Sequence, residues 1–169
     1  MIPNYSREDT KYGVEKENEL EGFFNNYFET KFQTTEHYND IDYICKNKKI
    51  IIELKSRRCV YKDYQTTMIS LYKIKSLMKK VQSGYNVYLF FNFTDGLYFY
   101  KLEKMNNEWI QSGGRMDRGK FEYKHQGYYY IPIEFLEEAI LLPKESPVLF
   151  RQNAMNFKSI NEYFEKKII

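Results

Sequence analysis

Residues 42–55, DYICKNKKIIIELK, decide how this chain folds, because they combine a strand-forming run with two carboxylates and an amine. The isoleucines at 50–52 and the leucine that follows are mostly β-branched and are bounded by polar residues, so they predict a β-strand. Side chains alternate between the two faces of a strand. Glu53 and Lys55 therefore share a face with Ile51, and the other face is wholly apolar.

Residues 40–44 predict a preceding strand, and Lys46-Asn47-Lys48 predicts the connection between the two strands. In an antiparallel hairpin the start of the first strand lies beside the end of the second, which would bring Asp42 near Glu53. Asp40 and Asp42 share a face, so alternation does not decide between them. We favour Asp42 because it lies deeper in the apolar segment, whereas Asp40 follows Asn39 in a predicted turn.

Two carboxylates beside an amine predict metal chemistry. Mg²⁺ takes oxygen ligands, commonly one or two carboxylates with waters and phosphate oxygens. A bound ion lowers the pKa of its water, and a neighbouring lysine can orient or deprotonate that water or offset negative charge. In a chain that is 29% charged, the spacing alone is equally compatible with charges on an exposed edge strand. The apolar strand and the flanking helices favour the chemical interpretation.

Helical periodicity appears on both sides of this hairpin. Upstream, Glu17 precedes an apolar stripe at helical spacing and would project from its N-terminal end towards the sheet. Downstream, we expect a helix that begins at Thr66 or Thr67, runs to Val81 and is stopped by Gly84. The upstream stripe consists of Leu20, Phe23, Phe24, Tyr27 and Phe28.

The remaining pattern predicts an α/β fold with a mixed central sheet flanked by helices. Further strands are expected at residues 86–91, 97–100, 108–111 and 128–131, and a short helix at 133–139 after Pro132. The length and the lack of a linker-like tract predict one domain over residues 1–142. Residues 143–169 predict a C-terminal extension that ends in a helix and packs on the core or on a second copy, so a homodimer is one expectation.

These segments resemble the PD-(D/E)XK nuclease superfamily, particularly its small phage and large-virus members. The resemblance covers residues 13–100. Ile41 stands where the family's name has proline. The matching residues are Gly13 to Glu17, Asp42, Glu53-Leu54-Lys55, Ser56-Arg57-Arg58, Tyr64 to Met68, and Lys73.

The resemblance implies a restriction-endonuclease-like αβββαβ core with extra C-terminal strands and a helix. It implies that Glu17 joins Asp42 and Glu53 as a metal ligand and that Lys55 acts on the water. In such nucleases a polar residue of the downstream helix approaches the catalytic face, and Gln65 and Lys73 are the candidates here.

The net charge of +3 is too small to establish a nucleic-acid partner, so the distribution of charge matters more. Basic residues follow the motif directly and recur in a glycine-rich loop that could approach a phosphate backbone or be a plain surface connection. Tyr61, Tyr64 and residues 128–130 could stack on unpaired bases or serve packing. The candidates for DNA contact are Arg57, Arg58, Lys62, Gln65, Lys73, Arg115, Arg118 and Lys120.

The expected function is therefore a DNA nuclease that uses Mg²⁺, with Mn²⁺ as a substitute. Two alternatives remain: a non-catalytic nucleic-acid-binding or assembly module with the same fold, and an RNA-directed nuclease. No segment has the length of a membrane span or the pattern of a signal peptide. Two cysteines and two histidines give neither a disulfide framework nor a zinc site, which favours an intracellular setting.

Overall fold

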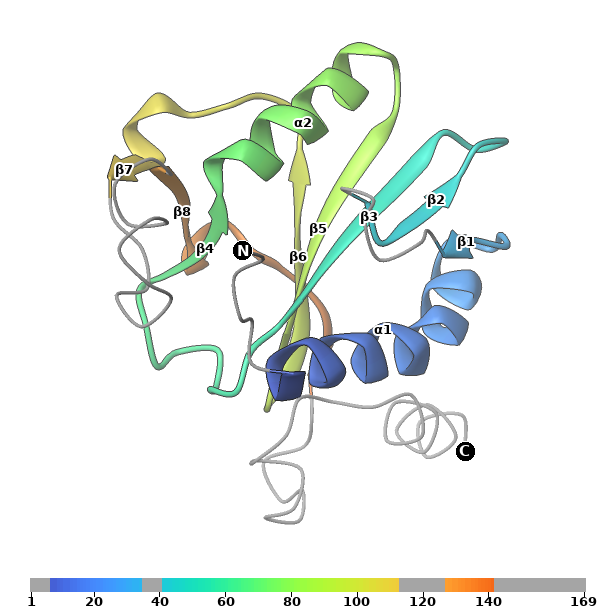
Figure 1. Cartoon of the computed structure of the whole chain (residues 1–169), viewed down its shortest axis with the longest axis horizontal. Helices are drawn as coiled ribbons and strands as arrows, with labels where there is room; N and C mark the ends of the chain where they lie inside the picture. Colours follow the sequence, from blue (N-terminus) through green and yellow to red (C-terminus); the bar gives the residue numbers. More distant parts are fainter. Residues whose placement is uncertain (1–6, 35–40, 113–126, 142–169) are drawn as a thin grey trace.

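A six-stranded mixed sheet forms the centre of the structure, in the order β1-β2-β3-β5-β6-β9. In the computed structural model, which describes residues 7–34, 41–112 and 127–141, two α-helices and a second sheet of three strands accompany it (Figure 1). The fold is thus α/β with a mixed sheet and helices packed on it, as the sequence predicts.

The elements follow one another along the chain from α1 to β9. They are α1 (Arg7–Tyr27), β1 (Gln33–Thr34), β2 (Tyr43–Cys45), β3 (Ile50–Ser56), β4 (Thr66–Ser70), α2 (Leu71–Gln82), β5 (Asn86–Phe93), β6 (Gly96–Leu102), the 3₁₀ turn Asn107–Trp109, β7 (Ile110–Ser112), β8 (Gly127–Pro132), the 3₁₀ turn Ile133–Phe135 and β9 (Glu137–Leu141).

The strand β3 is central and divides the core into two clusters. Its even-numbered residues pack with the α1 stripe of Leu20, Phe23 and Phe24. Ile51 packs on the other side with Ile74 and Leu77 of α2. Since neighbouring side chains of a strand point to opposite faces, α1 and α2 cover opposite faces of the sheet. Glu53 and Lys55 therefore belong to the face that α2 covers.

Aromatic contacts hold α1 against the sheet. The ring of Phe24 lies 5.1 Å from that of Tyr43 and 4.8 Å from that of Phe90, both in edge-to-face geometry. The rings of Phe28 and Tyr88 lie 5.0 Å apart at the other end of the stripe. Such pairs add to the burial of large apolar surface, so the stripe predicted from the sequence is the surface on which α1 docks.

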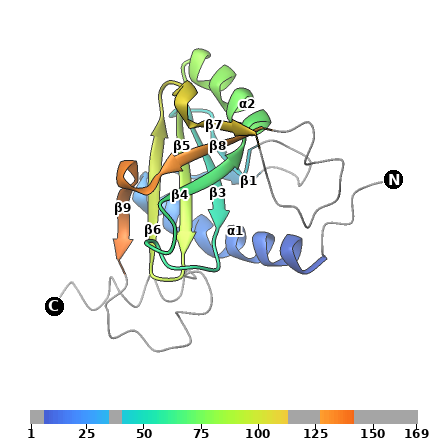
Figure 2. The same cartoon turned by 90° about the vertical axis from the view of Figure 1, so that its left-hand side faces the viewer.

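A second sheet, in the order β4-β8-β7, lies on the α2 side of the large sheet. Figure 2 shows it crossing the large sheet next to α2. Ile69 of β4 and Tyr129 and Ile131 of β8 join the same apolar cluster as Ile51. After β3 the chain forms β4, an edge strand of the small sheet, and continues into α2. The start of α2 lies over Glu53 of β3.

Several local predictions are confirmed. The β2–β3 hairpin forms, with Tyr43 opposite Ile52, and its turn takes in Lys46 to Lys49. The strands predicted at 86–91, 97–100 and 128–131 lie within β5, β6 and β8. Gly84 follows the end of α2 with φ +87°, a conformation that favours glycine, and so stops the helix as predicted.

Three predictions of secondary structure are wrong. Residues 66–70 form β4 rather than the first turn of a helix, because they pair in register with β8 from Thr66 opposite Pro132 to Ser70 opposite Tyr128. Residues 137–141 form β9 rather than the end of a helix, because they pair with the outer edge of β6. Residues 107–109 form a 3₁₀ turn, and β7 begins only at Ile110. For β4 and β9, pairing with a distant strand outweighs a weak local preference.

The loop with Arg115, Arg118 and Lys120, the extension 143–169 and Asp40 lie outside the described residues. Among the helices that the structure describes, none has the length and hydropathy needed to pass through a bilayer.

The true start of α2 gives a stability test. The Ser70 hydroxyl accepts a hydrogen bond from the Lys73 N–H at 3.3 Å, so Ser70 is the N-cap. We expect Ser70→Ala to lower the free energy of unfolding by about 1 kcal/mol, the usual cost of a lost cap. Thr66→Ala, an exposed position at the other end of β4, should change it by less than about 0.5 kcal/mol. Urea unfolding measures both changes. If Thr66→Ala lowered the free energy of unfolding more than Ser70→Ala does, Thr66 and not Ser70 would be the helix cap.

Candidate active site

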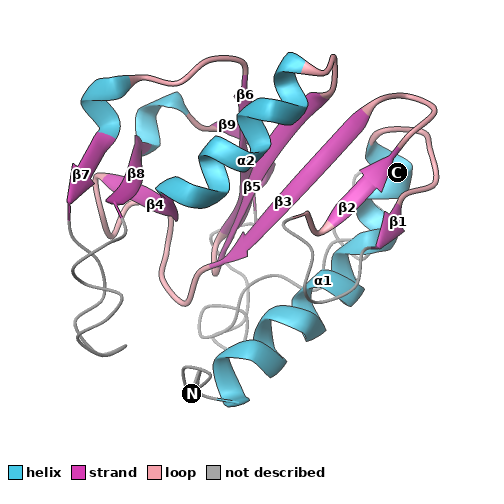
Figure 3. Ribbon diagram, turned by 45° about the horizontal axis from the view of Figure 1, so that its top comes forward, coloured by secondary structure: helices cyan, strands magenta, loops and turns pink. Residues whose placement is uncertain are grey.

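Glu53 occupies the centre of the candidate site. It lies on β3 between β2 and β5, and its side chain has no exposed surface. Figure 3 shows β3 passing between the two helices, with α2 above the sheet face that carries Glu53. A buried carboxylate is costly unless charged or hydrogen-bonding groups compensate it, so its neighbours decide whether it can stay ionised.

Two ammonium groups compensate this carboxylate. Lys55 Nζ lies 2.5 Å from Glu53 Oε1, and Lys73 Nζ lies 3.1 Å from Oε2. Among the described residues, the Lys55 ammonium is the partner of Oε1. One lysine comes from the same strand and the other from the first turn of α2. The ion pairs therefore join helix and sheet at this point.

Asp42 lies beside Glu53, directly before β2. Its Oδ2 accepts a hydrogen bond from the Leu54 N–H at 2.7 Å, and the β2–β3 register, continued by one residue, sets it opposite Glu53. Burial and the negative charge of Glu53 raise the pKa of Asp42 to about 7; Glu17 adds to the effect, while Lys55 and the Leu54 hydrogen bond oppose it. The predicted meeting of the two carboxylates is therefore present.

Glu17 approaches the same site from α1. Its backbone carbonyl accepts a hydrogen bond from the Tyr43 hydroxyl, next to Asp42 in the chain. Its negative charge raises the pKa of Asp42 and, together with burial, that of Tyr43. Glu17 is thus close enough to act electrostatically on Asp42, and the Tyr43 contact holds this part of α1 in place.

The charge around Lys55 decides its protonation. Burial alone would lower its pKa, but the carboxylates of Glu53 and Asp42 more than offset this, and the pKa is raised. Lys55 is therefore an ammonium at neutral pH in the structure described. In this state it can orient a water molecule or stabilise negative charge, but it cannot take a proton.

The donor set fits a hard divalent cation. Asp42 and Glu53 provide two adjacent carboxylates, and Glu53 Oε1 is buried without an aligned hydrogen bond. Across residues 7–34, 41–112 and 127–141, no three acidic, histidine or cysteine side chains are gathered closely enough to form a complete ligand set. Carboxylate oxygens are the ligands that hard divalent cations take in proteins.

A buried Glu53 with Asp42 and Lys55 beside it, on a hairpin between two helices, is the arrangement that the sequence resemblance implied. The family model described as "Phage putative PDDEXK endonuclease" matches residues 4–139, well over half of the 169 residues. The chain belongs to this phage PD-(D/E)XK endonuclease family. Comparisons with curated proteins and with solved structures gave no match. PD-(D/E)XK nucleases typically use divalent metals, which agrees with the donor set.

In this phage PD-(D/E)XK protein, Arg57 is held by the protein itself. Its Nε donates to Thr67 Oγ1 at 3.2 Å, its guanidinium also donates to the Met68 carbonyl, and its backbone N–H donates to the Asn92 carbonyl at 2.8 Å. Arg57 therefore ties the end of β3 to β4 and β5. Any contact with DNA would add to this structural role.

The other predicted DNA contacts are distributed differently. Arg58, Lys62 and Gln65 are exposed on the segment between β3 and β4. Gln65 precedes a strand and does not lie on a helix, and its carbonyl accepts the Ile133 N–H at 3.0 Å. Lys73 does lie on the helix and reaches the site, but as a partner of Glu53. The sequence predicts that Lys73 approaches this face, but its pairing with Glu53 depends on how α2 lies over β3.

The tyrosines divide into packed and exposed ones. Tyr61 stacks on Tyr98 with ring centroids 3.9 Å apart and donates its hydroxyl to the Ile133 carbonyl at 2.6 Å. Tyr129 is fully buried. Both serve packing, the second of the two interpretations of the sequence. Tyr64 is 67% exposed and is not committed to the core.

The raised pKa of Asp42 predicts how stability depends on pH. The folded state binds the Asp42 proton more tightly than the unfolded chain does. The stabilisation that this proton gives is fully present below about pH 4 and is lost as pH rises through about 7. In EDTA, wild-type stability should fall by roughly 2–4 kcal/mol through Asp42 between pH 4 and 8, whereas Asp42→Asn should lack this component. Asn retains an acceptor for Leu54, so the variant should be the more stable protein at pH 8.

Thermal unfolding across this pH range measures the difference between the two proteins, which removes the contribution of other titrating groups. Asp63→Asn is the matched control, because Asp63 also accepts a backbone N–H, that of Val60 at 3.0 Å, but is exposed to solvent. Parallel profiles for wild type and Asp42→Asn would show that Asp42 is not in the environment described.

Proposed function

We propose that this protein hydrolyses phosphodiester bonds of DNA in a reaction that depends on a divalent cation, Mg²⁺ or in its place Mn²⁺. The observation that supports this most directly is the fully buried Glu53 carboxylate beside Asp42, with Lys55 and Lys73 in contact with it. Ionisable groups buried inside a sheet are seldom explained by stability, since hydrophobic replacements are often equal or better. Membership of a nuclease family supplies the reaction class.

Asp42 and Glu53 would hold the ion. Glu17, the third predicted ligand, would add its negative charge from α1 and would have to move closer to bind the ion directly. When bound, the ion supplies Lewis-acid stabilisation of a phosphate under attack and a more acidic water. Lys55 would orient the attacking water and stabilise negative charge as an ammonium, the form in which its neighbours hold it. Lys73 would contribute positive charge to the same phosphate.

Basic side chains near the end of β3 would contact the DNA backbone. Arg58 and Lys62 are exposed there, and Arg57 is anchored between β3 and β4. Gln65 extends this set, and the glycine-rich loop would add Arg115, Arg118 and Lys120. Contacts of this kind position the strand without reading its sequence and weaken as salt rises.

A cleavage assay tests the proposal. With Mg²⁺ or Mn²⁺ the wild type should cleave linear, single-stranded or branched DNA, and EDTA should stop it. Glu53→Gln and Lys55→Ala should each lower the rate by about 10²–10⁴, the usual effect of removing an acid–base or charge-stabilising group. Glu103→Gln changes an exposed glutamate and should keep full activity.

Two results would count against a DNA nuclease. Intact DNA in every form under these conditions, with binding that needs no metal, would favour the non-catalytic module. Cleavage restricted to RNA would leave the reaction class intact and change only the substrate.

The ion pair of Lys73 gives a second test that does not depend on activity. Its ammonium and a divalent cation would compete for Glu53, so Lys73→Met should strengthen Mn²⁺ binding by about tenfold, equivalent to ~1.4 kcal/mol of relieved repulsion. Lys75→Met, two residues along α2 and exposed, is the control. Isothermal titration measures both affinities. Equal Mn²⁺ affinity in the two variants would show that Lys73 does not compete with the cation for Glu53.

A further inference from the structure

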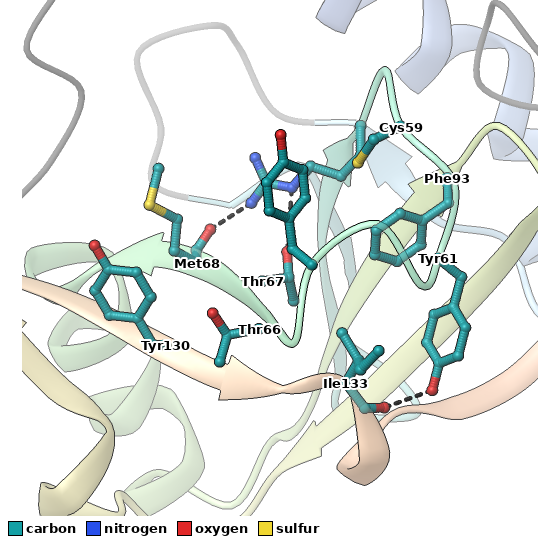
Figure 4. A pocket seen from close by; sticks show the side chains of 10 residues that line it. Cys59, Tyr61, Thr66, Thr67, Met68, Phe93, Tyr130 and Ile133 are labelled. Atoms are coloured by element: carbon teal, nitrogen blue, oxygen red, sulfur yellow. Dashed lines mark hydrogen bonds between the residues drawn. The ribbon is translucent and has the colours of Figure 1, made fainter.

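A pocket of about 280 Å³ opens next to the candidate active site, between the segment that follows β3 and the small sheet. Figure 4 shows Met68, Thr66 and Tyr130 on one side of it and Phe93, Tyr61 and Ile133 on the other. These side chains come from β4, β5 and β8, the loop before β4 and the turn after β8. Tyr64 also lines it.

The pocket shares a wall with the active site. Arg57 lines it and lies two residues after Lys55, which contacts Glu53. The guanidinium is held in that wall by Thr67 and by the Met68 carbonyl, both residues of the pocket. Arg57 is therefore the residue that links the pocket to the candidate active site.

The lining favours a flat, largely apolar group. Aromatic rings and the Met68 side chain supply most of the surface, with the Thr66 and tyrosine hydroxyls as the polar groups. The volume is just below the range of roughly 300–1,000 Å³ typical of sites for drug-sized ligands, so a single ring system fits better than a large cofactor. The cation in the wall suits a ligand that carries a phosphate next to its ring.

Tyr64 is the side chain best placed to contact such a ligand. Its ring is 67% exposed at the pocket, whereas Tyr61 is already stacked on Tyr98. Every nucleobase has a flat face that stacks on an aromatic ring whatever its identity. An exposed tyrosine at an apolar pocket beside an arginine thus has the composition of a base-stacking site.

We propose that this pocket receives an unpaired nucleobase of the substrate strand and so presents the adjacent phosphodiester to Glu53 and Lys55. The inference rests on the proposed nuclease function and adds a substrate class to it. A base inside a duplex must first be unstacked and unpaired, which costs least at ends, branches and single strands. The enzyme would therefore prefer DNA with unpaired bases over intact duplex.

Cys59 provides a direct readout, because its thiol lines the pocket. The chain has two cysteines, and the other, Cys45, is buried and serves as an internal reference. Burial raises the pKa of Cys59, so alkylation with iodoacetamide is followed at alkaline pH by mass spectrometry of the full chain in EDTA. The probes are a single-stranded oligonucleotide, its duplex, and an abasic strand of the same length and charge.

The single strand should slow alkylation of Cys59 by about tenfold at saturation, while the bound abasic strand and the duplex should leave it nearly unchanged. Tyr64→Ala should weaken binding of the single strand by about tenfold, the effect of losing one base–aromatic stack. Tyr72→Ala is the matched control, since Tyr72 is also 67% exposed but lies on α2 outside the pocket.

Equal protection by the abasic and the base-bearing strands, or equal affinities of Tyr64→Ala and Tyr72→Ala, would overturn the base pocket even if the protein cleaves DNA. If wild type neither binds nor cleaves any DNA, the proposed function fails and this inference fails with it. If the protein cleaves DNA but the single strand does not slow alkylation of Cys59, the base pocket is wrong and the proposed nuclease function stands.

Discussion

The burial of one carboxylate governs the arrangement of this protein. Glu53 has no exposed surface, and the positive charges of Lys55 and Lys73 compensate it from a strand and from a helix. Removing a partner from such a cluster leaves a charge in a medium that solvates it poorly, so the first turn of α2 must stay above β3. Burial and the same charge raise the pKa of Asp42, and a cation between the two carboxylates would relieve their repulsion.

The two faces of the sheet differ because side chains alternate along β3. One face is filled by α1 and its aromatic stripe, and the other carries the charged side chains under α2. Tyr43, next to Asp42 in the chain, fixes α1 on the first face, because it packs against Phe24 and donates its hydroxyl to the Glu17 carbonyl. An apolar layer therefore supports the carboxylates from behind, which keeps them rigid and limits the water around them.

Arg57 joins the candidate active site to its surroundings. Its hydrogen bonds to Thr67 and Met68 attach the end of β3 to the edge of the small sheet, and the neighbouring pocket forms on the far side of that contact. A positive charge held in this way is preorganised, because little side-chain freedom remains to be lost when a phosphate arrives. The additions to the αβββαβ core thus build a surface beside the candidate active site.

The sequence by itself determined the parts that depend on neighbours in the chain. The alternation of β3, the hairpin that brings Asp42 to Glu53, the stripe of α1 and the stop at Gly84 are all local patterns with one physical solution each. The tertiary structure decided the rest. β4 and β9 are strands because they pair with β8 and β6. Local propensity carries no information about these distant pairing partners. The pairing of Lys73 with Glu53 and the pocket beside Arg57 exist only once these sheets meet, because charges and cavities depend on distances that folding sets.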